Sequence, residues 1–127
     1  MNESDPRDPL LIALLFNECI NTGDLYGLCA LMTPDHVFID ARGGASRGAT
    51  VLWAAWRDFF RKYPDYRNHF SMLRSTGATV SIIGCSTCSC EDLDGPALWS
   101  ARIEAGRVAE WRVWLDTRGN RELLGFR

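Results

Sequence analysis

The sequence predicts one α+β domain in which three N-terminal helices pack on one face of a curved, mostly antiparallel sheet. Two observations carry this prediction. Helical periodicity is confined to the first half of the chain, and the second half shows four runs of period-two alternation separated by turn signals. A length of 127 residues with 46% hydrophobic content suits a single compact core, so we expect residues 1–127 to form one domain.

The three expected helices have clear start and stop signals. Asp8 and the following proline begin the first helix, and Gly23 ends it in a left-handed conformation. Asp24 caps the second helix, and Pro34 follows its end. Pro64 stops the third helix. The expected spans are Pro9–Thr22, Leu25–Met32 and Ala49–Lys62.

Five segments read as strands because apolar and polar residues alternate along them or because turn signals bound them. They are His36–Arg42, Arg67–Thr76, Thr79–Cys90, Ala97–Ala105 and Arg107–Asp116.

Register decides which side chains of the last two strands share a face. The Ala105-Gly106 turn pairs Glu104 with Arg107, and uninterrupted pairing then places Trp99 opposite Arg112. One face would carry Trp99, Ala101, Ile103, Val108, Glu110, Arg112, Trp114 and Asp116. The other would carry Leu98, Ser100, Arg102, Ala109, Trp111, Val113 and Leu115.

These two faces predict different roles. Charges beside tryptophans favour a concave face that lines a cavity, where a few polar groups orient a mostly apolar ligand. The opposite face is apolar and no expected helix covers it, so we predict a homodimer interface there. The interface residues would be Leu98, Trp111, Val113 and Leu115.

Several short motifs carry a resemblance to a known family. They are Asn21-Thr22-Gly23-Asp24-Leu25, Val37-Phe38-Ile39-Asp40, the glycine before the third helix, Gly106-Arg107-Val108 and Trp111-Arg112-Val113-Trp114-Leu115-Asp116. Over roughly residues 10–118 the chain resembles the nuclear transport factor 2-like superfamily, and within it the SnoaL-like polyketide cyclases and relatives of ketosteroid isomerase. The resemblance implies a cone-shaped α+β barrel with a hydrophobic pocket. It also implies a choice among isomerases, cyclases, dehydratases, epoxide hydrolases and non-catalytic members.

The resemblance implies roles for two aspartates. Asp40 matches the first-strand aspartate that ketosteroid isomerase uses as its proton shuttle, and Asp116 matches the acid/base aspartate of SnoaL-like cyclases. Other isomerase groups are absent, because the helix-one tyrosine falls on Phe16 and the partner aspartic acid on Trp99. The segment Thr79–Cys90 lacks the arginine-aspartate pair of the epoxide hydrolases.

Each candidate also has a structural interpretation. A carboxylate in an apolar cavity can exchange a proton near neutral pH, but Asp116 could instead pair with Arg112, and Asp40 could border the Gly43-Gly44 loop. Arg112 could hold a developing negative charge or stack on Trp99. The aromatic residues expected to contact the ligand, or alternatively to fill the core, are Phe16, Phe38, Trp56, Trp99 and Trp114.

Composition excludes several classes of protein. The net charge is −2 and the basic residues form no run, so we expect no nucleic-acid partner. The apolar run Leu10–Phe16 is too short for a membrane span, and the acidic segment Met1–Pro9 does not resemble a secretory signal, so a cytoplasmic location is expected. Five cysteines fit a reducing compartment, and Cys85, Cys88 and Cys90 lack the spacing of a zinc site.

The sequence therefore predicts an acid/base enzyme of isomerase, cyclase or dehydratase type that uses no cofactor and no metal. It would act on a small hydrophobic carbonyl compound, with Asp40 or Asp116 moving the proton and Arg112 stabilising negative charge. The alternative is a non-catalytic small-molecule-binding or dimeric interaction module of the same fold. His36 and His69 are expected to be surface or capping residues.

Overall fold

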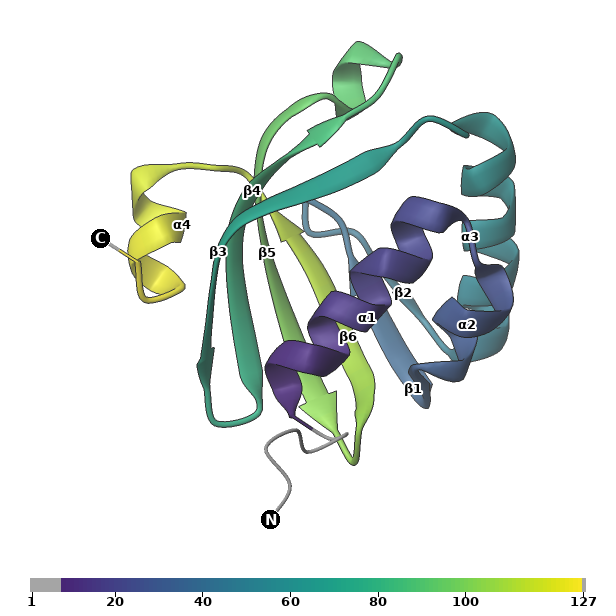
Figure 1. The fold of residues 1–127 in the computed structure, drawn as a ribbon, viewed down its shortest axis with the longest axis horizontal. Helices are drawn as coiled ribbons and strands as arrows, with labels where there is room; N and C mark the ends of the chain where they lie inside the picture. The colour runs from purple at the N-terminus through teal and green to yellow at the C-terminus, as the bar shows by residue number, and fades with distance from the viewer. Residues whose placement is uncertain (1–7, 127) are drawn as a thin grey trace.

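The computed structural model describes residues 8–126, in which four α-helices pack on an open six-stranded sheet (Figure 1). The prediction made for the acidic N-terminal segment falls mainly on residues 1–7 and lies outside this part. The elements are α1 Pro9–Thr22, α2 Leu25–Ala30, β1 Met32–Ile39, β2 Ala45–Arg47, α3 Ala49–Lys62, β3 Arg67–Thr76, β4 Thr79–Thr87, β5 Gly95–Glu104, β6 Arg107–Trp114 and α4 Arg118–Leu123, with a 3₁₀ turn η1 at Glu91–Leu93. No helix of the described residues is long and apolar enough to cross a membrane.

The sheet has the strand order β2-β1-β6-β5-β4-β3. Strands β1 and β6 run parallel, and the other four neighbouring pairs are antiparallel. Helices α1, α2 and α3 lie on one side of this curved sheet, which we call the inner face, and α4 lies on the opposite side, the outer face (Figure 1). The predicted α+β class and the mostly antiparallel sheet are confirmed.

The helix boundaries follow local capping chemistry. Asp8 accepts a hydrogen bond from the backbone N–H of Leu10 at 3.0 Å, and Gly23 ends α1 with φ 67°. Both α1 and α3 span the predicted residues. Helix α2 is two residues shorter than predicted, because the chain enters β1 already at Met32 and Pro34 lies inside that strand. The pairing of β1 with β6 is irregular between Met32 and Val37.

A β-bulge in β6 overturns the predicted faces of the last two strands. The Ala105-Gly106 turn has φ above zero at both residues and pairs Glu104 with Arg107 as expected. The register then shifts between Arg102 and Ile103, because Ala109 is an extra residue in β6.

Beyond the bulge every side chain of β6 lies on the face opposite to the predicted one. Trp99 is opposite Val113, and Ala101 is opposite Trp111, so these residues share the inner face. Arg112 is opposite Ser100 and Trp114 is opposite Leu98, which places these four residues on the outer face.

The predicted dimer surface is therefore wrong in its composition. Trp111 is 1% exposed and belongs to the inner core, together with the partly buried Val113. Leu98 is fully buried, and Leu115 alone of the four is exposed. These residues form no continuous apolar patch, so the observation that motivated a homodimer through them is lost.

The C-terminal helix α4 was not predicted, and it covers part of the outer face. The guanidinium of Arg74, on β3, donates to the carbonyl of Gly125, and Phe126 is 5% exposed. Thr117 caps α4 by accepting a hydrogen bond from the N–H of Asn120 at 3.1 Å. The expectation that no helix covers this side of the sheet is corrected.

Candidate functional site

A cavity of about 600 Å³, which we call the cone cavity, lies between α3, the inner face of the sheet and the loop that joins β4 to β5. Its size is within the usual range for small-molecule sites. Its wall combines aromatic residues with other apolar and polar ones. The aromatic residues that line it are Phe38, Trp56, Phe59, Tyr66, Trp99, Trp111 and Trp114.

The aromatic rings on the α3 side contact one another edge to face. The ring centroids of Phe38 and Trp56 are 5.7 Å apart, those of Trp56 and Phe59 are 5.4 Å apart, and those of Phe59 and Tyr66 are 5.0 Å apart. Such T-shaped pairs are favourable and hold each ring in one orientation. The wall is therefore firmly packed before any ligand enters.

Two indole N–H groups of this wall have no hydrogen-bond partner. Among residues 8–126 the Nε1 atoms of Trp56 and Trp99 have no partner, and both side chains are buried, with 8% and 0% of their surface exposed. A buried donor left without a partner destabilises a protein by about 1–3 kcal/mol. The indole of Trp114, by contrast, donates to Ser100 Oγ at 2.8 Å. The tryptophans of the cavity wall therefore include two whose buried indole donors have no partner.

A chain of polar side chains forms another part of the wall. The Oγ of Ser86 donates to Asn68 Oδ1 at 2.8 Å, and the hydroxyl of Tyr66 lies 3.1 Å from Ser86 Oγ. Asn68 Nδ2 donates to Asn17 Oδ1 at 3.1 Å, and Asn21 pairs with the backbone of Asn68 through both ends of its amide. Burial raises the pKa of Tyr66, so its phenol is protonated at neutral pH.

Charged residues gather at the mouth of the cavity. Asp40, Arg42, Asp92 and Asp94 line it, and three of these four are carboxylates. Asp94 Oδ1 accepts from the N–H of Cys88 at 2.9 Å. The mouth is therefore acidic.

The side chain of Asp65, between α3 and β3, holds the β4–β5 loop in place. Its carboxylate accepts from the N–H of Ser89 at 2.9 Å and from the Ser89 hydroxyl at 3.2 Å. The Sγ of Cys88 lies 3.6 Å from the same carboxylate.

All five cysteines are unpaired.

Asp40 is exposed at this mouth and organises the loop that follows β1. Its Oδ1 accepts from the backbone N–H groups of Arg42 and Gly44, both at 2.9 Å. Within residues 8–126 its Oδ2 accepts no hydrogen bond. The predicted structural role beside the Gly43-Gly44 loop is therefore present, and one carboxylate oxygen is free in addition.

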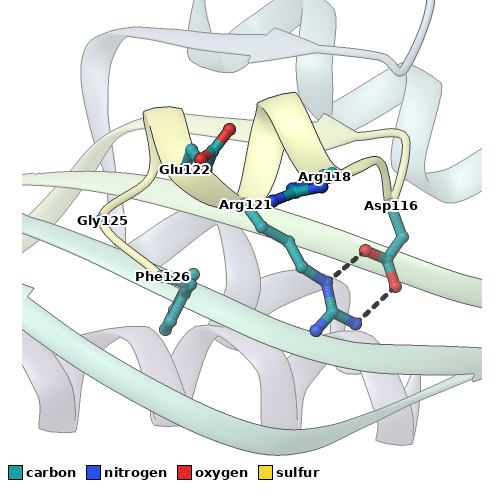
Figure 2. A pocket seen from close by; sticks show the side chains of 6 residues that line it. All are labelled: Asp116, Arg118, Arg121, Glu122, Gly125 and Phe126. Atoms are coloured by element: carbon teal, nitrogen blue, oxygen red, sulfur yellow. Dashed lines mark hydrogen bonds and ion pairs between the residues drawn. The ribbon is translucent and has the colours of Figure 1, made fainter.

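Asp116 does not line the cone cavity. It lies beneath α4, where Arg121 reaches back and binds its carboxylate through two nitrogens, at 2.6 and 2.9 Å (Figure 2). The hydrogen bonds from Arg121 hold the pKa of Asp116 below its usual range. For a structural role of Asp116, the sequence had indicated Arg112 as the partner. The partner is Arg121, which the sequence did not indicate because α4 was not predicted.

Two other predicted site residues also lie away from the cone cavity. The Arg112 guanidinium stacks on the ring of Trp114 at 3.7 Å, on the outer face, and does not line the cavity. Phe16 is buried in the core against Trp111, with ring centroids 4.8 Å apart. Of the residues predicted to contact ligand, Phe38, Trp56 and Trp99 line the cavity. Trp114 borders the cavity as well, but its indole lies on the outer face, where it bonds Ser100.

The SnoaL-like domain family matches residues 13–111 of the chain, which is most of its length. The chain belongs to this family. Among curated proteins none matches.

Solved structures share the fold of this SnoaL-like domain at low sequence identity. A putative polyketide cyclase from Sinorhizobium meliloti is 16% identical with a TM-score of 0.74, covering 87% of this chain and 99% of its own. An LEH-like epoxide hydrolase of M. tuberculosis is 15% identical with a TM-score of 0.75, covering 85% of this chain and 82% of its own. An NTF2-like protein from Burkholderia pseudomallei is 16% identical with a TM-score of 0.73, covering 96% and 99%. Identities this low show the fold alone.

The polar chain is the part of the SnoaL-like cavity that sequence reasoning missed. Asn68 lies in a correctly predicted strand, and period-two alternation puts it on the same face as Phe70 before the bulge in that strand. A polar residue on an otherwise apolar face was a usable signal. Its partner Ser86 lies opposite it on β4. This pairing of β3 with β4 could not be predicted from the residues of the connecting loop.

The histidine predictions differ in outcome. His69 is exposed and bonds Thr87 Oγ1 at 2.9 Å, as a surface residue. His36 is 0% exposed and packs its ring against Phe16, so the expected surface or capping role for it is wrong. Its Nδ1 lies 2.6 Å from the carbonyl of Val108, next to the β6 bulge.

Proposed function

We propose that this SnoaL-like domain binds a small, mostly apolar molecule in the cone cavity. The observation that carries the proposal is the pair of unpartnered indole N–H groups, Trp56 and Trp99, in an aromatic cavity of about 600 Å³. A ligand that buries apolar surface and offers an oxygen to these donors would gain from both effects. A carbonyl compound of two or three fused rings fits this volume.

Binding is tested with 2-tetralone, a bicyclic ketone, by tryptophan fluorescence and calorimetry. We expect saturable binding that Ala55→Phe weakens at least tenfold, because Ala55 lines the cavity and a phenyl ring there would occupy it. Val51→Phe is the matched control, since Val51 is exposed on the same helix and does not line the cavity. Equal affinity in both variants, or no binding to the unaltered protein, would refute the proposal.

Acid/base catalysis in the same cavity is the second candidate, with Asp40 as the proton carrier. The free Oδ2 of Asp40 at the cavity mouth favours it, because the loop N–H groups hold the carboxylate in place through Oδ1. The donors that could stabilise an enolate oxygen are the indoles of Trp56 and Trp99, in place of the predicted Arg112. We do not assign a catalytic role to Asp116, whose two oxygens are bound by Arg121.

The catalytic candidate is tested by deuterium exchange at the acidic CH₂ of 2-tetralone in D₂O, followed by NMR. We expect the protein to accelerate exchange and Asp40→Asn to lose about 100-fold or more of that acceleration while still binding the ketone. The asparagine keeps an oxygen for the loop N–H groups, so the loop is preserved. Asp35→Asn is the control, because Asp35 is exposed on β1 and does not line the cavity. Binding of the ketone without any acceleration of exchange would refute catalysis and support the binding function only.

A further inference from the structure

We infer that the ligand of the cone cavity is a neutral molecule carrying a hydroxyl group, bound between the Tyr66 oxygen and the unpartnered indole N–H groups. This inference rests on the proposed small-molecule binding and adds the chemical class. It follows from counting the hydrogens available in the chain Tyr66–Ser86–Asn68.

Ser86 has no hydrogen left to give to Tyr66. A serine hydroxyl has one hydrogen, and Ser86 gives it to Asn68 Oδ1 at 2.8 Å. Ser86 Oγ can then only accept from Tyr66, so the phenol donates its single hydrogen along the 3.1 Å contact. Asn68 is held in this orientation by its second bond, from Nδ2 to Asn17 Oδ1.

Tyr66 therefore offers the cavity an acceptor. Its hydrogen is committed to Ser86, so the Tyr66 oxygen presents acceptor lone pairs and no donor. The phenol stays protonated at neutral pH because burial raises its pKa, which keeps this assignment intact. A ligand group that binds there must therefore donate a hydrogen bond, which a ketone or ether oxygen cannot do.

The unpaired indoles of the wall have the opposite requirement to that of the Tyr66 oxygen. The indoles of Trp56 and Trp99 are donors and require an acceptor. A hydroxyl group both donates and accepts, so it can meet the demands of the phenol oxygen and of an indole.

The charge at the mouth favours a neutral ligand. Of the residues that line the cavity, Arg42 is the one cation, and it lies beside three aspartates at the mouth. An anionic ligand would meet repulsion there and no cation deeper in the cavity, so a phenol or alcohol is favoured over a carboxylate.

The test compares three bicyclic probes that differ in one group: naphthalene, 2-methoxynaphthalene and 2-naphthol. Naphthalene neither donates nor accepts, the ether only accepts, and the naphthol does both. We expect 2-naphthol to bind roughly 3- to 10-fold more tightly than the ether, the advantage that one neutral hydrogen bond gives. Affinities are measured by calorimetry and by ligand-observed NMR.

Two variants link this preference to the proposed atoms. Tyr66→Phe should abolish the difference between 2-naphthol and 2-methoxynaphthalene, whereas Tyr26→Phe, at an exposed tyrosine, should leave it unchanged. Ser86→Ala releases the Tyr66 hydrogen, so the phenol becomes a donor and the ether should gain affinity relative to the naphthol. This relative gain of the ether is not expected from a general loosening of the wall.

The outcomes separate the two proposals. If none of the three probes binds, the proposed small-molecule function fails. If naphthalene and the ether bind but 2-naphthol has no advantage, or if its advantage survives Tyr66→Phe, the hydroxyl inference is overturned while the binding function stands.

Discussion

We expect His36 to make the stability of the protein fall as the pH drops below about 6.5. Its imidazole is fully buried beneath α1, and its Nδ1 donates to the carbonyl of Val108 while Nε2 is buried without a partner. Burial lowers the pKa of His36 below its ordinary value of 6.5. The neutral ring therefore supports the backbone beside Ala109, the bulge residue that turns Trp111 toward the cavity.

The direction and size of the effect follow from proton linkage. The unfolded chain binds a proton at His36 below about pH 6.5, and the folded chain binds it only at a lower pH. Stability is therefore complete above pH 6.5 and falls as the pH drops through the window between the two pKa values. Each pH unit in that window lowers the free energy of unfolding by about 1.4 kcal/mol, so pH 5 costs up to about 2 kcal/mol.

The assay is urea unfolding at pH 7, 6 and 5 for the unaltered chain, His36→Asn and His69→Asn. An asparagine at position 36 retains an N–H donor for Val108 but does not titrate, so it should lose the pH dependence between 7 and 5. The exposed His69 serves as the control, and its replacement should keep that dependence. An unchanged slope in His36→Asn would show that this imidazole is not the group responsible.

Three further predictions test the structure around the site. Asp116→Asn should weaken the contact with Arg121, which lowers stability by about 0.2–1 kcal/mol at pH 7 and raises hydrogen exchange in α4. Because the pKa of Asp116 is lowered, the contribution of this contact should fade as the pH falls below about 4. Unchanged hydrogen exchange in the variant would contradict the prediction. Gly84→Ala would set a Cβ 2.0 Å from the carbonyl oxygen of His69, so we expect a loss of about 1–3 kcal/mol in thermal or urea unfolding, and full stability would contradict the close approach of β3 and β4. Asp24→Ala removes the cap of α2 and should cost about 1 kcal/mol, whereas Asp24→Asn should retain most of it; equal losses would argue against capping.

Most of the fold could be predicted because its signals are local. Caps such as Asp8 and Gly23 fix helix ends within a few residues, and the spans of α1, α3 and β3 agree with the sequence. Helix α4 was missed because it has few apolar positions and is held by its contacts with the sheet, such as Arg121 with Asp116. Such contacts are visible only in three dimensions.

The site was predicted less well because one residue reversed a whole strand. Ala109 carries no local mark of a bulge, yet it moves Trp111 to the inner face and Arg112 to the outer face. Trp56 on α3 and Trp99 on β5 were correctly predicted to line the cavity, since their positions did not depend on the register of β6, whereas Phe59 on α3 was not predicted as a ligand contact. The polar chain of Tyr66 and Ser86 depends on the pairing of β3 with β4 and needed the structure. A homodimer and a cytoplasmic location stay predictions from the sequence.

The most direct test of ligand binding in the cone cavity is the indole N–H region of a ¹⁵N–¹H NMR spectrum, recorded while 2-naphthol is added. The indole signals of Trp56 and Trp99, assigned by single replacements with phenylalanine, should shift in a saturable way because their unpaired N–H groups gain an acceptor. The signal of Trp53, which packs against Tyr26 and does not line the cavity, should stay in place. Saturation with neither cavity indole shifted, or with Trp53 shifted alone, would contradict the account.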